Sequence, residues 1–225
     1  MNQFSLNFDR ENYHEKPKND IFADAITRTQ QPIVTGTSVL AFKYKDGIML
    51  AADTLASYGS LARFTNIQRL YPVGDFTIIA ASGDISDFQY VQHLLDTVMV
   101  EEYYTNDGHV LRTQNIYEYL SRVMFLGYVD LLGTTYQSST IATGFGGYLA
   151  QPILRKAVEG REDTLTETEA IEIMNSCMKV LYYRDARSFN KFQRAKITAE
   201  GVEISGPYKA ETQWDFAEGL RGYGP

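Results

Sequence analysis

The sequence predicts a layered α+β fold, because its strand-like runs and its helix-like segments come in separate blocks. Strand-like runs occupy 37–52 and 76–81, helical segments follow at 86–102 and 116–124, and two short strands end the chain. Blocks of strands beside blocks of helices favour packed layers over alternating βαβ units.

The first block predicts a hairpin. Residues Thr37–Ala52 read TSVLAFKYKDGIMLAA, so two β-rich runs flank Lys45-Asp46-Gly47. Asp-Gly between such runs is a strong hairpin signal. Phe76–Ala81 (FTIIAA) is another apolar run of strand length.

A helix is predicted from Ser86 to about Glu102, because apolar residues recur there at helical spacing. The turn residues 105–108 end it. A second helix is indicated by apolar residues at Ile116, Tyr119, Leu120, Val123 and Met124. We expect a strand over Phe125–Leu132.

A third helix is predicted from about Gly147, with Pro152 in its first turns or at a kink. Thr166 and Glu169 then form a capping box, and an apolar i, i+3, i+4, i+7 pattern continues to Leu181. Cys177 lies on that apolar face and is expected to be a small core residue rather than a nucleophile.

The last block, Phe192–Ile197 and Val202–Ile204 around Glu200-Gly201, reads as a hairpin.

One junction is unusual. The second helix reaches Met124 and meets Phe125 with no turn signal between them, although a helix-to-strand change normally needs Gly, Pro or Asn. Either Gly127 makes the turn late, or residues are missing from the chain at this point.

Composition excludes several classes of protein. The 225 residues contain 44% hydrophobic and 22% charged side chains, which is typical of a globular domain. A net charge of −7 disfavours nucleic-acid binding through phosphates. No apolar run approaches the ~18 residues of a membrane helix. A single cysteine excludes an internal disulfide and indicates a reducing compartment.

Residues 1–28 differ from the rest of the chain, with charges of both signs and no sustained apolar period. They fit neither a secretory signal nor a mitochondrial transit peptide, because they lack a long apolar stretch and contain several acids. The pattern leaves two interpretations open: a disordered tail, or a pro-segment removed during maturation.

Metal and cofactor sites are not indicated. The histidines His14, His93 and His109 have no ligand spacing. The sequence has no phosphate-binding loop and no Gly-x-Ser-x-Gly elbow, and Gly144-Phe145-Gly146-Gly147 lacks the spacing of a dinucleotide turn. We therefore expect no cofactor.

Gly36-Thr37 is the remaining candidate for chemistry. A threonine can act as a nucleophile when its own α-amino group serves as the base, so the Gly36–Thr37 bond would first have to be cut. A nearby lysine would support such a site. By itself a Gly-Thr pair is a weak signal.

Several motifs in order resemble the proteasome β subunits. They are Thr37-Ser38-Val39-Leu40 followed by GIMLAAD, then SYGSLARF, SGD, TGFGG and YYRDARS. The longer segments TQQPIVTGTSV, ATGFGGYLAQPILR and MKVLYYRDARS, with a late WDFA, are most similar to the beta-7 group of that family, also called beta type-4. The likeness begins at Thr29 and continues almost to the end.

The resemblance implies the N-terminal-nucleophile fold, a four-layer αββα sandwich, over 29–225 as one domain. Residues 1–28 would then be a cleaved propeptide. The resemblance also implies further residues between Met124 and Phe125, including a core strand, so that we expect a stretch to be missing there.

Active members of the family use a threonine, an aspartate, a lysine, a serine in a Gly-Ser-Gly turn and a later Asp…Ser pair. By motif, Thr37 is at the nucleophile position and Asp53 at the first aspartate. Asp185 and Ser188 are at the later pair, and Gly83 is at the glycine that lines the substrate cleft.

Two positions depart from that pattern, because Arg69 replaces the lysine and Phe145 replaces the turn serine. Arginine cannot relay protons, since its pKa exceeds ~12. The resemblance also implies cleavage at Arg28-Thr29 by neighbouring subunits, which leaves residues 29–36 in place and Thr37 without a free amine. We therefore expect a degenerate site, in which Asp53 and Arg69 form a buried ion pair.

The function implied is that of a non-catalytic, structural β subunit of the 20S proteasome core. Its partners would be neighbouring β subunits, α-ring subunits, the opposite β ring and assembly chaperones, in the cytoplasm and nucleus. We expect interfaces around Tyr182–Arg187 and at the tail Trp214–Pro225. The alternatives are a catalytic threonine endopeptidase after Gly36-Thr37 cleavage, or a free-standing hydrolase of the same fold.

Overall fold

The computed structural model describes residues 33–105 and 126–215. The chain divides into two units, Met1–Ile33 and Val34–Pro225, and every element below belongs to the second unit. The predicted propeptide 1–28, the cleavage point Arg28-Thr29, the second predicted helix and the 124–125 junction lie outside the described residues, as do His14 and His109.

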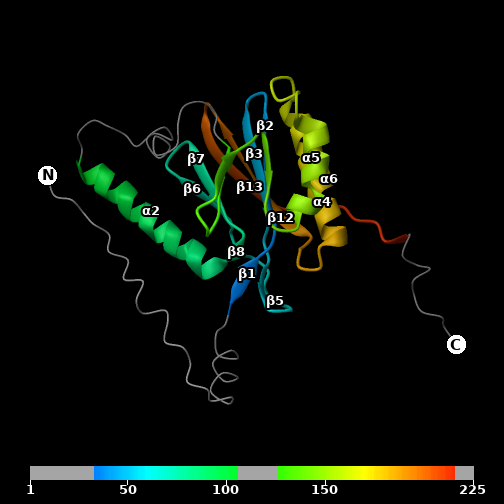
Figure 1. Cartoon of the computed structure of the whole chain (residues 1–225), viewed down its shortest axis with the longest axis horizontal. Helices are drawn as coiled ribbons and strands as arrows, with labels where there is room; N and C mark the ends of the chain where they lie inside the picture. Colours follow the sequence, from blue (N-terminus) through cyan, green and yellow to red (C-terminus); the bar gives the residue numbers. More distant parts are fainter. Residues whose placement is uncertain (1–32, 106–125, 216–225) are drawn as a thin grey trace, which may run out of the picture. The chain divides into compact units, whose positions relative to one another are not determined.

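A five-stranded antiparallel sheet forms the centre of this unit, in the order β11-β2-β3-β12-β13 (Figure 1). The strands are β2 (Val39–Tyr44), β3 (Gly47–Asp53), β11 (Thr140–Ala142), β12 (Lys191–Thr198) and β13 (Gly201–Lys209). Both predicted hairpins are confirmed. Tyr44 pairs with Gly47 in the first, and Thr198 pairs with Gly201 in the second.

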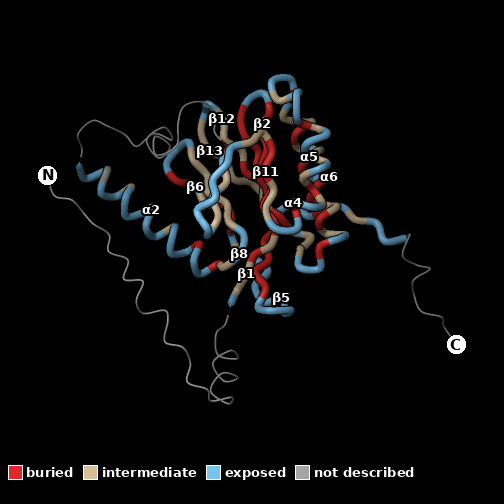
Figure 2. Tube along the Cα trace, in the orientation of Figure 1, coloured by how far each residue is buried: buried red, intermediate tan, exposed pale blue. Residues whose placement is uncertain are grey.

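The two faces of this sheet bury different cores, because alternate side chains of a strand point to opposite faces. Leu40, Phe42 and Met49 pack toward the helices. Val39, Ala41 and Leu50 pack toward a second layer of strands. Nearly all of β2 and β3 is therefore buried (Figure 2).

Three helices cover the first face: α4 (Gly146–Leu149), α5 (Gln151–Val158) and α6 (Glu167–Arg184) (Figure 1). The predicted third helix is two helices, since the chain breaks at Ala150 and Pro152 lies in the first turn of α5. The predicted capping box starts α6, where Thr166 Oγ1 and the Glu169 carboxylate each accept the other's backbone N–H. Cys177 is fully buried in the core of this layer.

The second layer consists of two separate ribbons. One is β6 (Leu70–Val73) with β7 (Thr77–Ala80), and the other is β9 (Gly127–Val129) with β10 (Thr135–Gln137). The strand expected over Phe125–Leu132 is therefore shorter, because Asp130 begins a turn. Ile78 of one ribbon and Tyr128 of the other pack on the same core cluster, yet within the described residues the ribbons do not pair.

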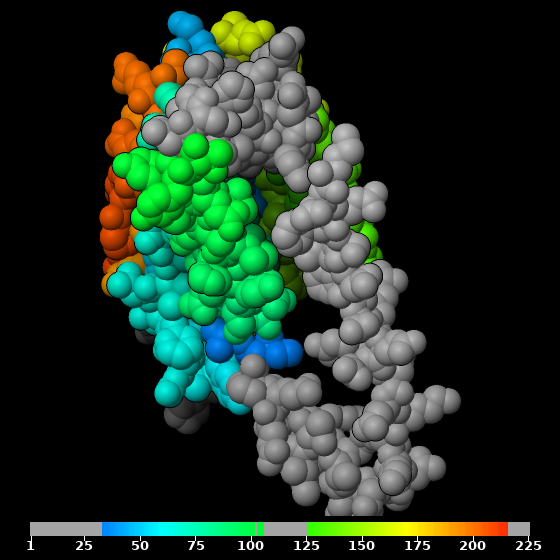
Figure 3. Space-filling view, turned by 90° about the vertical axis from the view of Figure 1, so that its left-hand side faces the viewer, coloured from blue at the N-terminus to red at the C-terminus, as the bar shows by residue number. Residues whose placement is uncertain are grey.

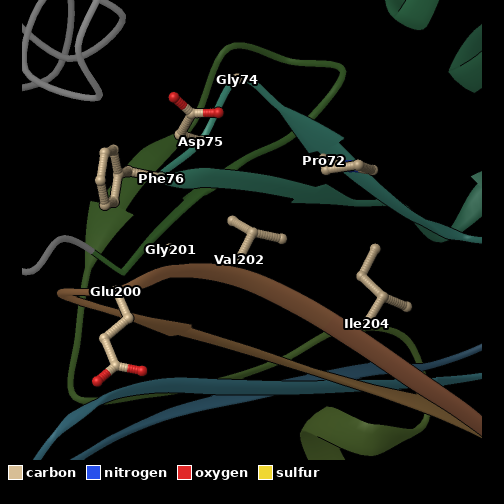
Figure 4. A pocket seen from close by; sticks show the side chains of 8 residues that line it. All are labelled: Pro72, Gly74, Asp75, Phe76, Glu200, Gly201, Val202 and Ile204. Atoms are coloured by element: carbon tan, nitrogen blue, oxygen red, sulfur yellow. The ribbon is translucent and has the colours of Figure 1, made fainter.

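An open cavity of about 510 Å³ lies beside the first ribbon, between its turn and the β12–β13 turn (Figure 4). Val202 and Ile204 of β13 point toward this space. Apolar side chains on the inner face of the sheet thus have incomplete cover here.

Helix α2 (Ile85–Thr105) contacts β6, where Tyr71 Oη donates to Asp96 Oδ1 at 2.6 Å. It confirms the helix predicted from Ser86, and Asp84 Oδ1 accepts the backbone N–H of Ser86 at its start. Several apolar side chains of α2 lie at the surface, Tyr90 and Val98 among them. Figure 3 shows this helix, in green, on the outside of the molecule. No helix of the described residues is long and apolar enough to span a bilayer.

A small four-stranded sheet holds the chain that leads to Thr37. Its order is β5-β4-β1-β8, with β1 (Val34–Gly36), β4 (Ala56–Tyr58), β5 (Leu61–Phe64) and β8 (Gly83–Asp84). None of these four strands is evident from the hydrophobic pattern, since they are short and partly exposed. Strand β1 lies between β4 and β8 in this sheet and pairs antiparallel with both.

Candidate functional site: a buried arginine behind Thr37

Thr37 lies between β1 and β2, two residues before β2 begins, and not at the first position of a strand as predicted. Its hydroxyl donates to Asp185 Oδ2 at 2.6 Å. Asp185 ends α6, and its other carboxylate oxygen accepts the backbone N–H of Arg187 at 2.9 Å. The threonine hydroxyl is therefore paired with an acceptor that is itself held in place.

Arg69 lies directly behind Thr37 and is fully buried. Its Nε donates to Asp53 O at 3.0 Å, and its Nη1 donates to Thr37 O at 2.8 Å and Ala81 O at 3.1 Å. Its Nη2 donates to Ser38 O at 3.0 Å and to Asp53 Oδ1. A guanidinium has five N–H donors, so all of them are used.

Asp53 ends β3 and is buried with Arg69, and the predicted ion pair is present. Its second oxygen accepts the backbone N–H of Phe189 at 2.9 Å. Burial raises the pKa of the Asp53 carboxyl, and the positive charge of Arg69 opposes that rise. Burial also lowers the pKa of Arg69. Each charge stabilises the other in a place that excludes water.

Ser188 makes its hydrogen bonds within the loop after α6 and not with Thr37. Its hydroxyl lies 3.0 Å from Leu181 O and 2.7 Å from Asp185 O, and its backbone N–H donates to Asp185 O at 3.1 Å. These contacts fix the turn that presents Asp185 to Thr37.

Phe145 and Gly83 line a cavity of about 340 Å³ together with Thr37 and Arg187. The Phe145 ring is 57% exposed, so an aromatic surface stands where the resemblance expected a hydroxyl. The structure thus brings Thr37, Asp53, Arg69 and Asp185 into one connected cluster, and Phe145 lines the cavity beside Thr37.

The sequence reasoning did not single out Ser38, Ala81 or Arg187. Ser38 Oγ accepts the backbone N–H of Gly146 at 2.8 Å, which joins the start of β2 to α4. Ala81 contributes only its carbonyl, so no side-chain signal could have found it. Arg187 was expected as part of an interface segment, Tyr182–Arg187, and not as a neighbour of Thr37.

The family described as Proteasome subunit matches residues 33–125 and 119–197 of the chain. The chain belongs to the proteasome subunit family. The family's αββα sandwich agrees with the layers seen here: helices α4–α6, the five-stranded sheet, the two ribbons, and α2.

Individual proteasome subunits are similar over most of the chain. The Proteasome subunit beta type-4 of Xenopus laevis is 44% identical over 89% of this chain and 93% of its own length. The Probable proteasome subunit beta type-7 of Schizosaccharomyces pombe is 45% identical over 93% and 94%. The Proteasome subunit beta type-7 of Saccharomyces cerevisiae is 42% identical over 90% and 88%.

The proteasome relatives also contain residues that this chain lacks. The Xenopus match extends over 225 aligned positions but covers 89% of the chain, about 200 residues, so about 25 positions have no counterpart here. The family match likewise falls into two stretches, which overlap at 119–125, next to β9.

Proposed function

We propose that this chain is a non-catalytic β subunit of the 20S proteasome core, which builds the particle and does not itself cleave peptides. Membership of the proteasome subunit family, and similarity to subunits named beta type-4 and beta type-7, support the first part. The contacts of Arg69 support the second.

The main support for the proposal is the complete set of hydrogen bonds made by the Arg69 side chain. A threonine nucleophile needs a group that accepts and returns protons near its hydroxyl. Arg69 occupies the position of the family's lysine, but an arginine has no acceptor and does not lose its proton. Since all its N–H groups are bound to carbonyl oxygens and Asp53, it is a structural cross-link between three segments.

The extension before Thr37 also argues against catalysis. Gly36 pairs with Gly83 of β8, and Thr35 pairs with Ser57 of β4, so both edges of β1 are paired with neighbouring strands. A peptide that bound as an added strand would need those same backbone groups. With residues 29–36 retained, the Thr37 nitrogen is an amide and not a base.

The proposed partners are neighbouring β subunits, an α-ring subunit, the opposite β ring and the chaperones that assemble them. The proposed location is the cytoplasm and nucleus. Aromatic side chains and arginine, which are enriched at protein interfaces, gather at the end of α6, where the Tyr183 and Trp214 ring centres lie 5.1 Å apart. The proposed tail interface extends beyond Asp215, outside the described residues.

The experiment is a Thr37→Ala exchange in intact particles, with peptidase activity measured against each class of model peptide. We expect every activity to match that of wild-type particles. Loss of one activity, with normal particle yield on a sizing column, would support the catalytic alternative instead. Elution of the wild-type chain as a free monomer would favour a free-standing hydrolase.

A further inference from the structure

The turn between β9 and β10 is held by its own hydrogen bonds. Asp130 Oδ1 accepts the backbone N–H groups of Leu132 and Thr134, both at 2.9 Å. The backbone N–H of Gly133 donates to Asp130 O at 3.0 Å, and that of Asp130 donates to Thr134 O at 3.2 Å. Gly133 adopts φ +79°, which a side chain would disfavour. The tip therefore has a defined conformation.

The base of this hairpin is fixed to the body of the protein. The rings of Tyr128 and Tyr136 pair across the two strands with their centres 4.9 Å apart. Tyr128 packs on the inner core of the five-stranded sheet. These contacts fix the base of the hairpin, so the tip points in one direction from the protein.

Two leucines occupy that tip and are almost completely exposed. Leu131 is 96% exposed and Leu132 is 83% exposed, and Val129 beside them is 67% exposed. Turn positions usually carry polar residues or glycine, since nothing is gained by showing apolar side chains to water. Burial of the two leucines against another protein surface would explain why this fixed turn carries them.

Between Tyr128 and Tyr136 the acidic or basic side chains number only one, Asp130, and its Oδ1 accepts N–H groups of the turn itself. The Asp130 carboxylate is directed back to the turn, and the N–H groups of Thr134 and Leu132 hold its pKa below the usual range. The complementary surface is an apolar socket, because the two leucines are the most exposed side chains of the tip. A pre-formed tip also loses little conformational entropy on docking.

We propose that Leu131 and Leu132 form a docking knob that inserts into an apolar socket on a different subunit of the same proteasome particle. The family membership supplies the kind of partner, because proteasome subunits assemble with one another. This inference is independent of whether Thr37 is catalytic. It assigns one specific contact surface to a segment of nine residues, 128–136.

A competition experiment tests the knob. Wild-type chain and a tagged Leu131→Ser, Leu132→Ser chain are expressed together, and their ratio is measured in free chain and in assembled particles. We expect the variant to be depleted about tenfold or more from particles, with an unchanged melting temperature as free chain. The control is Leu61→Ser on β5, where the leucine is 55% exposed. Equal incorporation, or an equal loss in the control, would overturn the proposal.

Crosslinking identifies the partner directly. A benzophenone amino acid at position 131 is activated by light in intact particles, and the adduct is sequenced by mass spectrometry. The expected adduct joins position 131 to an apolar surface of a different subunit. An adduct with residues of this same chain, one with a second copy of it, or no adduct at all would overturn the proposal.

Discussion

The side chain of Arg69 lies directly against Gly36, the last residue of the extension. A Cβ atom built on Gly36 would stand 2.6 Å from Cδ of Arg69 and 3.1 Å from its Nη1. Arg69 cannot move aside easily, because its guanidinium is held by four carbonyl oxygens and Asp53. Arg69 therefore also fixes the path of the chain into Thr37.

Gly36→Ala is expected to destabilise the protein by about 1–3 kcal/mol, as overpacking of a filled site does. The added methyl must displace either β1 or the Arg69 stem. Chemical denaturation measures the free energy of unfolding. Gly147→Ala is the matched control, since a Cβ there meets only Ala142 O at 3.5 Å. Two variants of equal stability would contradict the packing described.

Arg69→Met is expected to cost about 3–5 kcal/mol, because it leaves the buried Asp53 carboxylate without its cation. Adding Asp53→Asn removes that stranded charge, so the double variant should unfold at higher denaturant than Arg69→Met alone. A double variant that loses the sum of both single effects would show that the two side chains do not interact.

The sequence predicted the parts of this protein that follow a strong local pattern. The hairpin at Lys45-Asp46 and the capping box at Thr166 depend on neighbours in the chain, and both are present. The Asp53–Arg69 pair was expected from the family resemblance rather than from spacing. The carbonyl contacts of Arg69 could not be predicted, because backbone acceptors from Thr37, Ser38 and Ala81 carry no side-chain signal.

The small sheet around β1 shows a second limit of prediction from sequence. Strands β1, β4 and β8 have two or three residues each and satisfy one another's backbone groups, so no apolar period marks them. The split third helix is a third case, since Pro152 tolerates either a first-turn position or a kink and only packing decides.

Cys177 should resist alkylation in the folded protein. Burial raises the pKa of its thiol to about 12, and the thiolate is the reactive form. Iodoacetamide at neutral pH should modify it only after denaturation, as mass spectrometry would detect. Since an unfolded thiol ionises near ~8.5, stability should fall as pH rises above that value. Rapid labelling of native protein would contradict this burial.

Inserting a segment between 124 and 125, where a missing stretch was expected, should stabilise the fold. The two ribbons of the second layer do not pair within the described residues, and Val202 faces an open cavity beside β6. Inserting the aligned residues of the Xenopus subunit should raise the melting temperature and reduce binding of a hydrophobic dye. A shuffled insert of equal length is the control, and equal effects of both inserts would contradict a missing strand.

The N-terminal residue of this chain in purified particles tests the central claim most directly. Mass spectrometry of the intact subunit gives it without further chemistry. A chain that begins at Thr29 retains the extension and leaves Thr37 without a free amine, as we predict for a structural subunit. A chain that begins at Thr37 would carry a free threonine amine and would contradict the account.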